Sequence, residues 1–231
     1  MKQLKAISFP RSGVSIFCKI LIEYYKNTPK KVYYCNTVSC CGHKQPCKKT
    51  ETMDLDLIYM KNHDFGGKVA NEVNKDIVHV VLYRKHAQEQ INAYFRYSSG
   101  GRRNAEPLKR SKTYQTDGTP DKYMNYLNRK TQFAARDKFA KKWIYNNTNP
   151  NTYFLEYDDY MSDPLKHMTR ILSCVDDNVD VDKMGKILKE LDVRKHFHIK
   201  DSVYYIEDFT ERYGLKDIDF DPSDRFLNNK K

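Results

Sequence analysis

The residues from 9 to 15 combine a turn and side chains that suit the binding of a phosphate group. They lie between a short apolar run and a helical pattern, and they read Phe9-Pro10-Arg11-Ser12-Gly13-Val14-Ser15. At such a strand–loop–helix junction, backbone N–H groups and the positive end of the helix dipole attract anions. Arg11 adds a fixed charge, and Gly13 lets the backbone approach a ligand. Ser12 and Ser15 add hydroxyl donors. The Gly-x-x-x-x-Gly-Lys-Ser/Thr spacing of a Walker A loop is absent, and ordinary helix capping is the alternative interpretation.

Three further apolar segments also end on polar or charged residues. One leads into Lys61 and His63, one ends at Arg84, and one ends at Tyr157. In an open parallel sheet the ligand crevice lies at the carboxyl ends of the strands. The pattern therefore predicts an α/β fold with a central parallel sheet flanked by helices and a P-loop-like strand–loop–helix unit at the N-terminus. We expect strands near 3–8, 31–35, 56–61, 77–83 and 152–156, and helices near 13–26, 86–97, 121–146, 163–174 and 181–191. His79 falls inside an apolar strand pattern and is interpreted as a core histidine.

These segments resemble, in the same order along the chain, four elements of the sulfotransferases that use 3′-phosphoadenosine 5′-phosphosulfate (PAPS). The four segments are Phe9–Ser15, Lys61-Asn62-His63, Tyr83-Arg84 with the helix that follows, and Tyr157-Asp158-Asp159-Tyr160 with Asp163-Pro164. The first is similar to the 5′-phosphosulfate loop of the family and the second to its Lys-x-His element. The third is similar to the 3′-phosphate motif, and the fourth to the Tyr-Glu-Asp-Leu segment near the adenine.

The resemblance implies in-line transfer of a sulfuryl group from PAPS to a hydroxyl acceptor, with 3′-phosphoadenosine 5′-phosphate (PAP) as the other product. It implies His63 as the general base, with Lys61 and Arg11 stabilising the charge that develops on the leaving phosphate. It implies no metal in the reaction. The implied contacts of the 5′-phosphosulfate group are Arg11, Ser12, Gly13, Val14 and Ser15.

The remaining implied cofactor contacts come from the third and fourth segments. Arg84 and Asn92 would hold the 3′-phosphate, and Tyr157 would lie beside the adenine. The family usually has a serine at the place of Asn92, and an asparagine amide can still donate a hydrogen bond to a phosphate.

Length and composition indicate one folded domain. The chain has 231 residues, of which 39% are hydrophobic, enough for one sizeable core and too few for two comfortable domains. We expect a single domain over 1–231, with a Cys-rich insertion at about 35–47 and a flexible basic loop at about 98–118. No apolar run approaches the roughly 20 residues of a membrane span. No signal-peptide pattern is seen either, so we expect a cytoplasmic protein or a chain trimmed of its leader.

The formal net charge of +11 has two interpretations. It suits an enzyme with a polyanionic cofactor, and it would also attract an acidic glycan or a nucleic acid. A generally basic, lysine-rich surface is the alternative. No recognised nucleic-acid-binding module appears, so we expect no specific nucleic-acid partner. The sequence leaves the oligomeric state open.

Four of the six cysteines are close together in sequence, at Cys35, Cys40, Cys41 and Cys47. Zinc would suit three of these thiols together with His43, because thiolates and imidazole form closed tetrahedral sites. One or two disulfides would fit a small loop equally well. The third alternative is reduced cysteines with no joint role. The spacing matches no standard zinc pattern, so all three alternatives stay open.

Two other functions compete with sulfuryl transfer. One is a non-catalytic binding protein of the same fold that holds an acidic glycan or a nucleotide. The other is a kinase with a variant phosphate loop, which the absence of a Walker lysine disfavours. The acceptor could be a glycan, a phenol, an alcohol or a protein tyrosine, and the basic loop favours a carbohydrate.

Overall fold

Five parallel strands form the centre of the molecule. The computed structural model describes residues 1–41, 47–64, 67–87, 90, 131–191 and 216–220. The strands are β1 (Lys2–Ser8), β2 (Val32–Asn36), β3 (Leu57–His63), β4 (Ile77–Tyr83) and β5 (Thr152–Glu156). They lie in the order β2-β3-β1-β4-β5, and every neighbouring pair is parallel. The predicted parallel sheet is confirmed, with small shifts at the ends of three strands.

The register of the sheet brings the carboxyl ends of four strands level with one another. Ser8 at the end of β1 pairs with His63 of β3 and with Leu82 of β4. Tyr83 of β4 in turn pairs with Glu156 of β5. From β1 the chain crosses to the edge strand β2 and returns to β3, and it then continues to β4 and β5 on the other side of β1. A crevice at the carboxyl ends forms where the connections reverse direction in this way.

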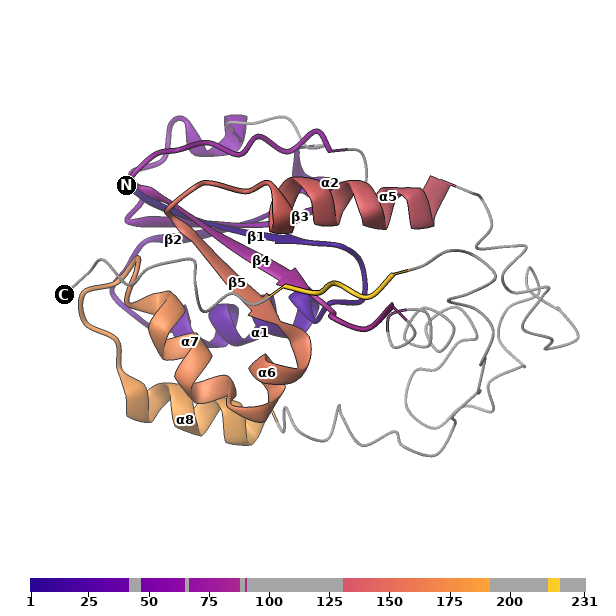
Figure 1. Cartoon of the computed structure of the whole chain (residues 1–231). Coiled ribbons are helices and arrows are strands. Elements are labelled where there is room, and N and C mark those ends of the chain that lie inside the picture. Colours follow the sequence, from indigo (N-terminus) through magenta and orange to yellow (C-terminus); the bar gives the residue numbers. More distant parts are fainter. Residues whose placement is uncertain (42–46, 65–66, 88–89, 91–130, 192–215, 221–231) are drawn as a thin grey trace, which may run out of the picture.

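One face of the sheet is covered by α1 (Val14–Tyr25) and α7 (Pro164–Leu172), and α8 (Val181–Glu190) packs against these two helices, as Figure 1 shows. Alternate residues of the strands, such as Leu4, Ala6 and Val80, are fully buried in this core. The helices begin where capping groups are placed. The Asp163 carboxylate accepts a hydrogen bond from the Lys166 N–H at 3.1 Å and so caps α7. Pro164 occupies the first turn of α7, where a backbone N–H would have no intrahelical acceptor, so a proline is tolerated there.

The opposite face is covered by α5 (Thr131–Ala140), which continues into the π-helical turn η2 (Lys141–Tyr145). This is the described part of the helix expected over 121–146. Trp143 is fully buried, and its indole N–H donates to the Asp64 carboxylate at 2.8 Å. Three short elements were not predicted: α2 (Thr37–Cys40), η1 (Lys48–Thr50) and α6 (Tyr157–Ser162). None of the helices within the described ranges is long and apolar enough to cross a membrane.

His79 is a core histidine, as predicted. It lies in the middle of β4 with no exposed surface, and the Asn149 side-chain amide nitrogen is 3.2 Å from its Nδ1. The same amide nitrogen also donates to the Asn71 side-chain oxygen at 3.0 Å and to the Glu72 carbonyl oxygen at 2.8 Å. Burial, with a smaller contribution from the charge of Lys5, lowers the pKa of His79 to about 4.

This histidine is expected to make the folded state less stable in acid. Below pH 6.5 the unfolded chain binds a proton that the folded chain does not, so the stabilisation is complete above 6.5 and is lost as the pH falls toward 4. A pKa shift of this size corresponds to about 3 kcal/mol in the free energy of unfolding. Urea unfolding of the native chain and of His79→Gln between pH 4 and 7 would measure it. Equal pH dependence in both proteins would contradict the assignment.

Candidate active site

The loop between β1 and α1 forms a tight turn at the N-terminus of α1. Arg11 and Gly13 both have positive φ angles, of 70° and 82°. The Gly13 carbonyl accepts hydrogen bonds from the N–H groups of Ile16 and Phe17, each at 3.1 Å. A Cβ atom on Gly13 would lie 2.7 Å from Cδ2 of the Tyr157 ring. The backbone conformation and this close approach both require glycine here.

Replacing Gly13 by alanine is therefore expected to destabilise the chain by at least about 1–2 kcal/mol, the cost of a left-handed conformation for a residue with a Cβ. The Tyr157 ring would also have to move away from the loop. Gly185 in α8 provides a matched control, because a Cβ there would meet nothing within 4 Å and alanine is the better helix former. Thermal unfolding should show a lower unfolding temperature for Gly13→Ala than for the native chain, and no decrease for Gly185→Ala.

The structure places the predicted residues of the loop in two groups. Arg11 and Ser15 are exposed at the carboxyl edge of the sheet. Ser12 is buried, and its hydroxyl lies 3.4 Å from the Gln90 amide nitrogen, which donates to it. Val14, the first residue of α1, packs its side chain in the core. Ser12 and Val14 can thus meet a ligand only through the backbone.

Arg84, at the end of β4, contacts the loop directly. Its Nε donates to the Arg11 carbonyl oxygen at 2.8 Å, and its guanidinium carbon lies 3.6 Å from the centre of the Tyr157 ring. This stacking fixes the plane of the guanidinium group. Asn92, the other predicted contact of the 3′-phosphate, lies outside the described residues, as does the basic loop at 98–118.

Tyr157 owes its position to the residue before it. Glu156 ends β5, and its carboxylate accepts hydrogen bonds from the N–H groups of Asp158 at 2.6 Å and Asp159 at 3.0 Å. These bonds cap α6, so that Tyr157 is its first residue. The other carboxylate oxygen accepts from the Lys85 N–H at 3.1 Å, which joins the start of α6 to the segment that carries Arg84.

Lys61 and His63 lie at the end of β3 and, two residues apart, point to the same face of the sheet. The Lys61 ammonium donates to the Ser15 hydroxyl at 3.0 Å. The half-buried His63 ring has its Nδ1 3.0 Å from the hydroxyl of Ser8, its partner in the β1–β3 register. The next residue, Asp64, accepts from Trp143 and from the Lys142 ammonium, each at 2.8 Å, and so anchors the end of β3.

Two buried polar residues that the sequence did not reveal hold the loop from behind. The Gln90 amide donates to the Pro10 carbonyl oxygen at 2.9 Å. Arg136 of α5 is almost fully buried and donates from Nε to the Gln90 side-chain oxygen at 2.8 Å. Burial lowers the pKa of Arg136. Arg136 lies within an apolar helical pattern with no local sign of this role.

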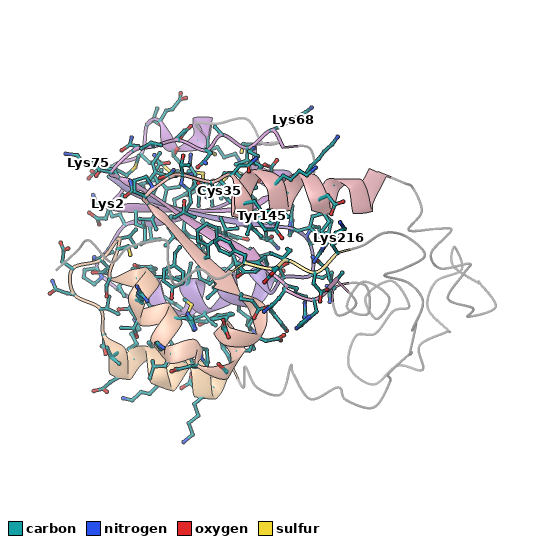
Figure 2. The ribbon with its side chains drawn as sticks, in the orientation of Figure 1. Lys2, Cys35, Lys68, Lys75, Tyr145 and Lys216 are labelled. Carbon is teal, nitrogen blue, oxygen red and sulfur yellow. The ribbon has the colours of Figure 1, made fainter. Side chains whose placement is uncertain are left out.

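Arg136 also fixes the segment 216–220. Its Nη1 donates to the Lys216 carbonyl oxygen at 2.7 Å, and Lys216 lies toward the carboxyl ends of the strands in Figure 2. The Asp217 carboxylate accepts from the Ala87 N–H at 2.9 Å. One hydrogen-bonded network, centred on the buried side chains of Gln90 and Arg136, thus holds both the loop and the segment that carries Arg84.

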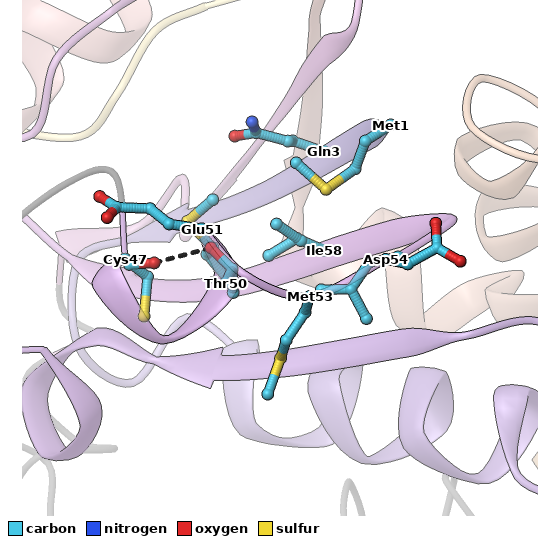
Figure 3. Close-up of a pocket in the computed structure, with 10 residues that line it drawn as sticks. Met1, Gln3, Cys47, Thr50, Glu51, Met53, Asp54 and Ile58 are labelled. Atoms are coloured by element: carbon cyan, nitrogen blue, oxygen red, sulfur yellow. Dashed lines mark hydrogen bonds between the residues drawn. The ribbon is translucent and has the colours of Figure 1, made fainter.

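A pocket of about 420 Å³ lies away from these residues, against the amino-terminal half of β1 (Figure 3). It is open and includes the exposed side chains of Met53 and Asp54. None of the predicted site residues lines it. Its lining is Met1, Gln3, Cys47, Thr50, Glu51, Met53, Asp54, Leu55, Ile58 and Met60.

No protein-family model matches the chain, and no curated protein matches it. Among solved structures, mouse sulfotransferase SULT7A1 complexed with PAP matches with a TM-score of 0.53 and 12% identity, over 82% of this chain and 63% of that one. Retinol dehydratase in complex with androsterone and the inactive cofactor PAP matches with a TM-score of 0.53 and 14% identity, over 83% of this chain and 65% of that one. The chain thus has the sulfotransferase fold, as the sequence predicted, and it spans less than two thirds of either structure.

Proposed function

We propose that this chain, which has the sulfotransferase fold, binds PAPS at the carboxyl edge of its sheet and transfers the sulfuryl group to a hydroxyl acceptor. One observation carries the proposal: residues from three other strand ends all reach the loop from Arg11 to Ser15. Lys61 reaches it through Ser15, Arg84 through the Arg11 carbonyl, and Tyr157 by packing on Gly13. SULT7A1 and retinol dehydratase, named above, were both solved with PAP, which supports the choice of cofactor.

The residues present suit a ligand with two phosphate groups. The loop offers the N-terminus of α1, a helix of 12 residues, and three cationic side chains surround it: Arg11, Lys61 and Arg84. Backbone N–H groups and fixed cations together bind phosphate well. When bound, PAPS would supply an activated sulfuryl group on a phosphate leaving group. We assign Arg84 to the 3′-phosphate, with Asn92 as its predicted partner, and Tyr157 to the adenine.

His63 is proposed as the general base. The Ser8 hydroxyl can donate to the Asn62 carbonyl oxygen at 3.5 Å while it accepts from Nδ1 of His63 at 3.0 Å. In that arrangement the proton of the neutral ring is on Nδ1, and Nε2 carries the lone pair that takes the proton of the acceptor hydroxyl. Ser8 is fully buried, so it acts as a positioning residue that orients the ring.

Lys61 and Arg11 are proposed to stabilise the leaving side. Lys61 already donates to Ser15 at the first turn of α1, which holds its ammonium at the loop. Both cations would be closest to the oxygen that becomes negative as the bond to sulfur breaks, and charge stabilisation of this kind contributes most in the transition state. This role needs no metal.

An assay of PAP release tests the proposal. The chain would be incubated with PAPS and, in turn, a sulfatable glycan, a phenol, a steroid alcohol and a tyrosine peptide, without added Mg²⁺. Parallel reactions would contain Mg²⁺ and a nucleoside triphosphate in place of PAPS. We expect PAP and a sulfate ester to form in equal amounts with at least one acceptor. The basic loop favours the glycan. PAP binding without turnover for every acceptor would favour the binding-protein alternative, and a strict need for Mg²⁺ with a nucleoside triphosphate would favour a kinase.

A further inference from the structure

Four cysteine sulfurs gather at one point between β2 and the segment that leads to β3. Cys35 lies in β2, Cys40 ends α2, Cys41 follows it, and Cys47 precedes η1. The Sγ atoms of Cys35 and Cys41 are 3.8 Å apart, and those of Cys40 and Cys47 are 3.7 Å apart. The Sγ atoms of Cys35, Cys41 and Cys47 all lie within 4.8 Å of one another. We name these four residues the four-cysteine cluster.

Two of the sulfur–sulfur distances, 3.8 Å and 3.7 Å, match the edge of a tetrahedron around a metal ion, and Cys40 lies next to Cys47 but outside the group of three. Four sulfurs held about 2.3 Å from one tetrahedral Zn²⁺ lie about 3.8 Å from one another. A disulfide would instead need two sulfurs about 2.05 Å apart, and all four cysteines are free thiols in the structure. Two of them, Cys35 and Cys47, are buried with at most 1% of their surface exposed, so the cluster has an interior side and an open side.

We propose that the four-cysteine cluster is a structural zinc site with four thiolate ligands. Tetrahedral sulfur ligands select Zn²⁺ among the common divalent ions, and four protein ligands leave no open position for chemistry. His43 lies outside the described residues, so the proposal rests on the four thiols alone. Binding displaces a proton from each thiol, so four protons leave as one Zn²⁺ enters. The Tyr33 hydroxyl, 3.4 Å from the Cys40 sulfur, can donate to the thiolate formed there.

The position of the cluster suggests what the zinc would stabilise. Figure 2 places Cys35 inside the molecule, and in the sheet this residue pairs with Met60 of β3. Thr37, between the first two ligands, donates from its hydroxyl to the Lys61 carbonyl oxygen at 2.9 Å. A zinc ion would thus join β2 and the segment after it to Cys47, and so hold in place the segment whose Thr37 bonds to Lys61, two residues before His63.

The test begins with the native chain, purified in reducing buffer without chelator. We expect about one zinc per chain by elemental analysis. We also expect replacement of zinc by Co²⁺ to give the visible absorption bands of a tetrahedral tetrathiolate site. Cys40→Ser/Cys41→Ser should lose the metal and the cobalt spectrum, whereas Cys174→Ser, outside the cluster, should keep both. Because the double variant can also fail to fold, the metal content of the native chain decides.

Three results would overturn the proposal. One is a metal-free native chain with six titratable thiols that gives no tetrathiolate spectrum with Co²⁺. The second is one or two disulfides among the four cysteines by non-reducing mass spectrometry. The third is iron in place of zinc at the site.

Discussion

Replacing His63 by glutamine is expected to lower the rate of sulfuryl transfer by about 10²- to 10⁴-fold, the contribution typical of a general base. Glutamine keeps a polar side chain of similar reach but cannot take a proton at neutral pH. The histidine lies beside Ser8 at the end of β3, outside the turn formed by the loop. PAP should therefore bind the variant with its native affinity. The measurement is kcat with PAPS, together with a calorimetric titration of PAP.

His167→Gln is the matched control, because His167 lies in α7, where its Nδ1 is 2.8 Å from the Tyr153 hydroxyl. Its kcat should stay close to the native value. If His63→Gln lost PAP binding and activity together, the role of His63 would be in holding the cofactor or the fold rather than in proton transfer.

Replacing Lys61 by methionine is expected to lower kcat by about 10²- to 10³-fold, as the loss of one electrostatic contact to a developing negative charge does. Methionine keeps much of the apolar stem and removes the ammonium that donates to Ser15 at 3.0 Å. The charge on the leaving oxygen is larger in the transition state than in bound PAPS, so the fall in kcat should exceed the loss of PAPS affinity. Steady-state kinetics and a titration of PAPS without acceptor, on one preparation, would compare the fall in kcat with the loss of PAPS affinity.

The exposed Lys19 of α1 gives the control for Lys61. Lys19→Met removes the same charge from the chain and should leave kcat unchanged. A Lys61→Met variant with a raised KM and a native kcat would mean that the ammonium binds substrate and transition state equally, which would contradict its assignment to the leaving side.

The sheet and the strand ends could be predicted because the information is local. Apolar runs such as 77–83 define buried strands by themselves, and the polar residue at the end of each run falls at the carboxyl edge of a parallel sheet. Lys61 and His63 could be placed on one face because side chains alternate along a strand. The loop needed a glycine for its turn, and Gly13 has the positive φ that only glycine adopts freely.

The parts that could not be predicted depend on contacts between distant residues. Gln90 and Arg136 hold the loop through hydrogen bonds that span 46 or more positions of sequence, and neither residue stands out in its own segment. The end of β5 at 156 was predicted, but the helix α6 that Glu156 caps was not. The cysteine spacing alone left three alternatives, and only the distances between the sulfurs favour one of them.

A calorimetric titration of PAP tests the central claim most directly, with adenosine 5′-phosphate as the ligand that lacks the 3′-phosphate. The native chain should bind PAP more tightly than adenosine 5′-phosphate. Arg84→Ala should remove about 1.5–3 kcal/mol of PAP binding, the range for a hydrogen bond to a charged group, and change the binding of adenosine 5′-phosphate much less. Lys85→Ala, which changes an exposed neighbour, should bind both ligands like the native chain. No binding of PAP to the native chain, or equal losses for both ligands in Arg84→Ala, would contradict the account.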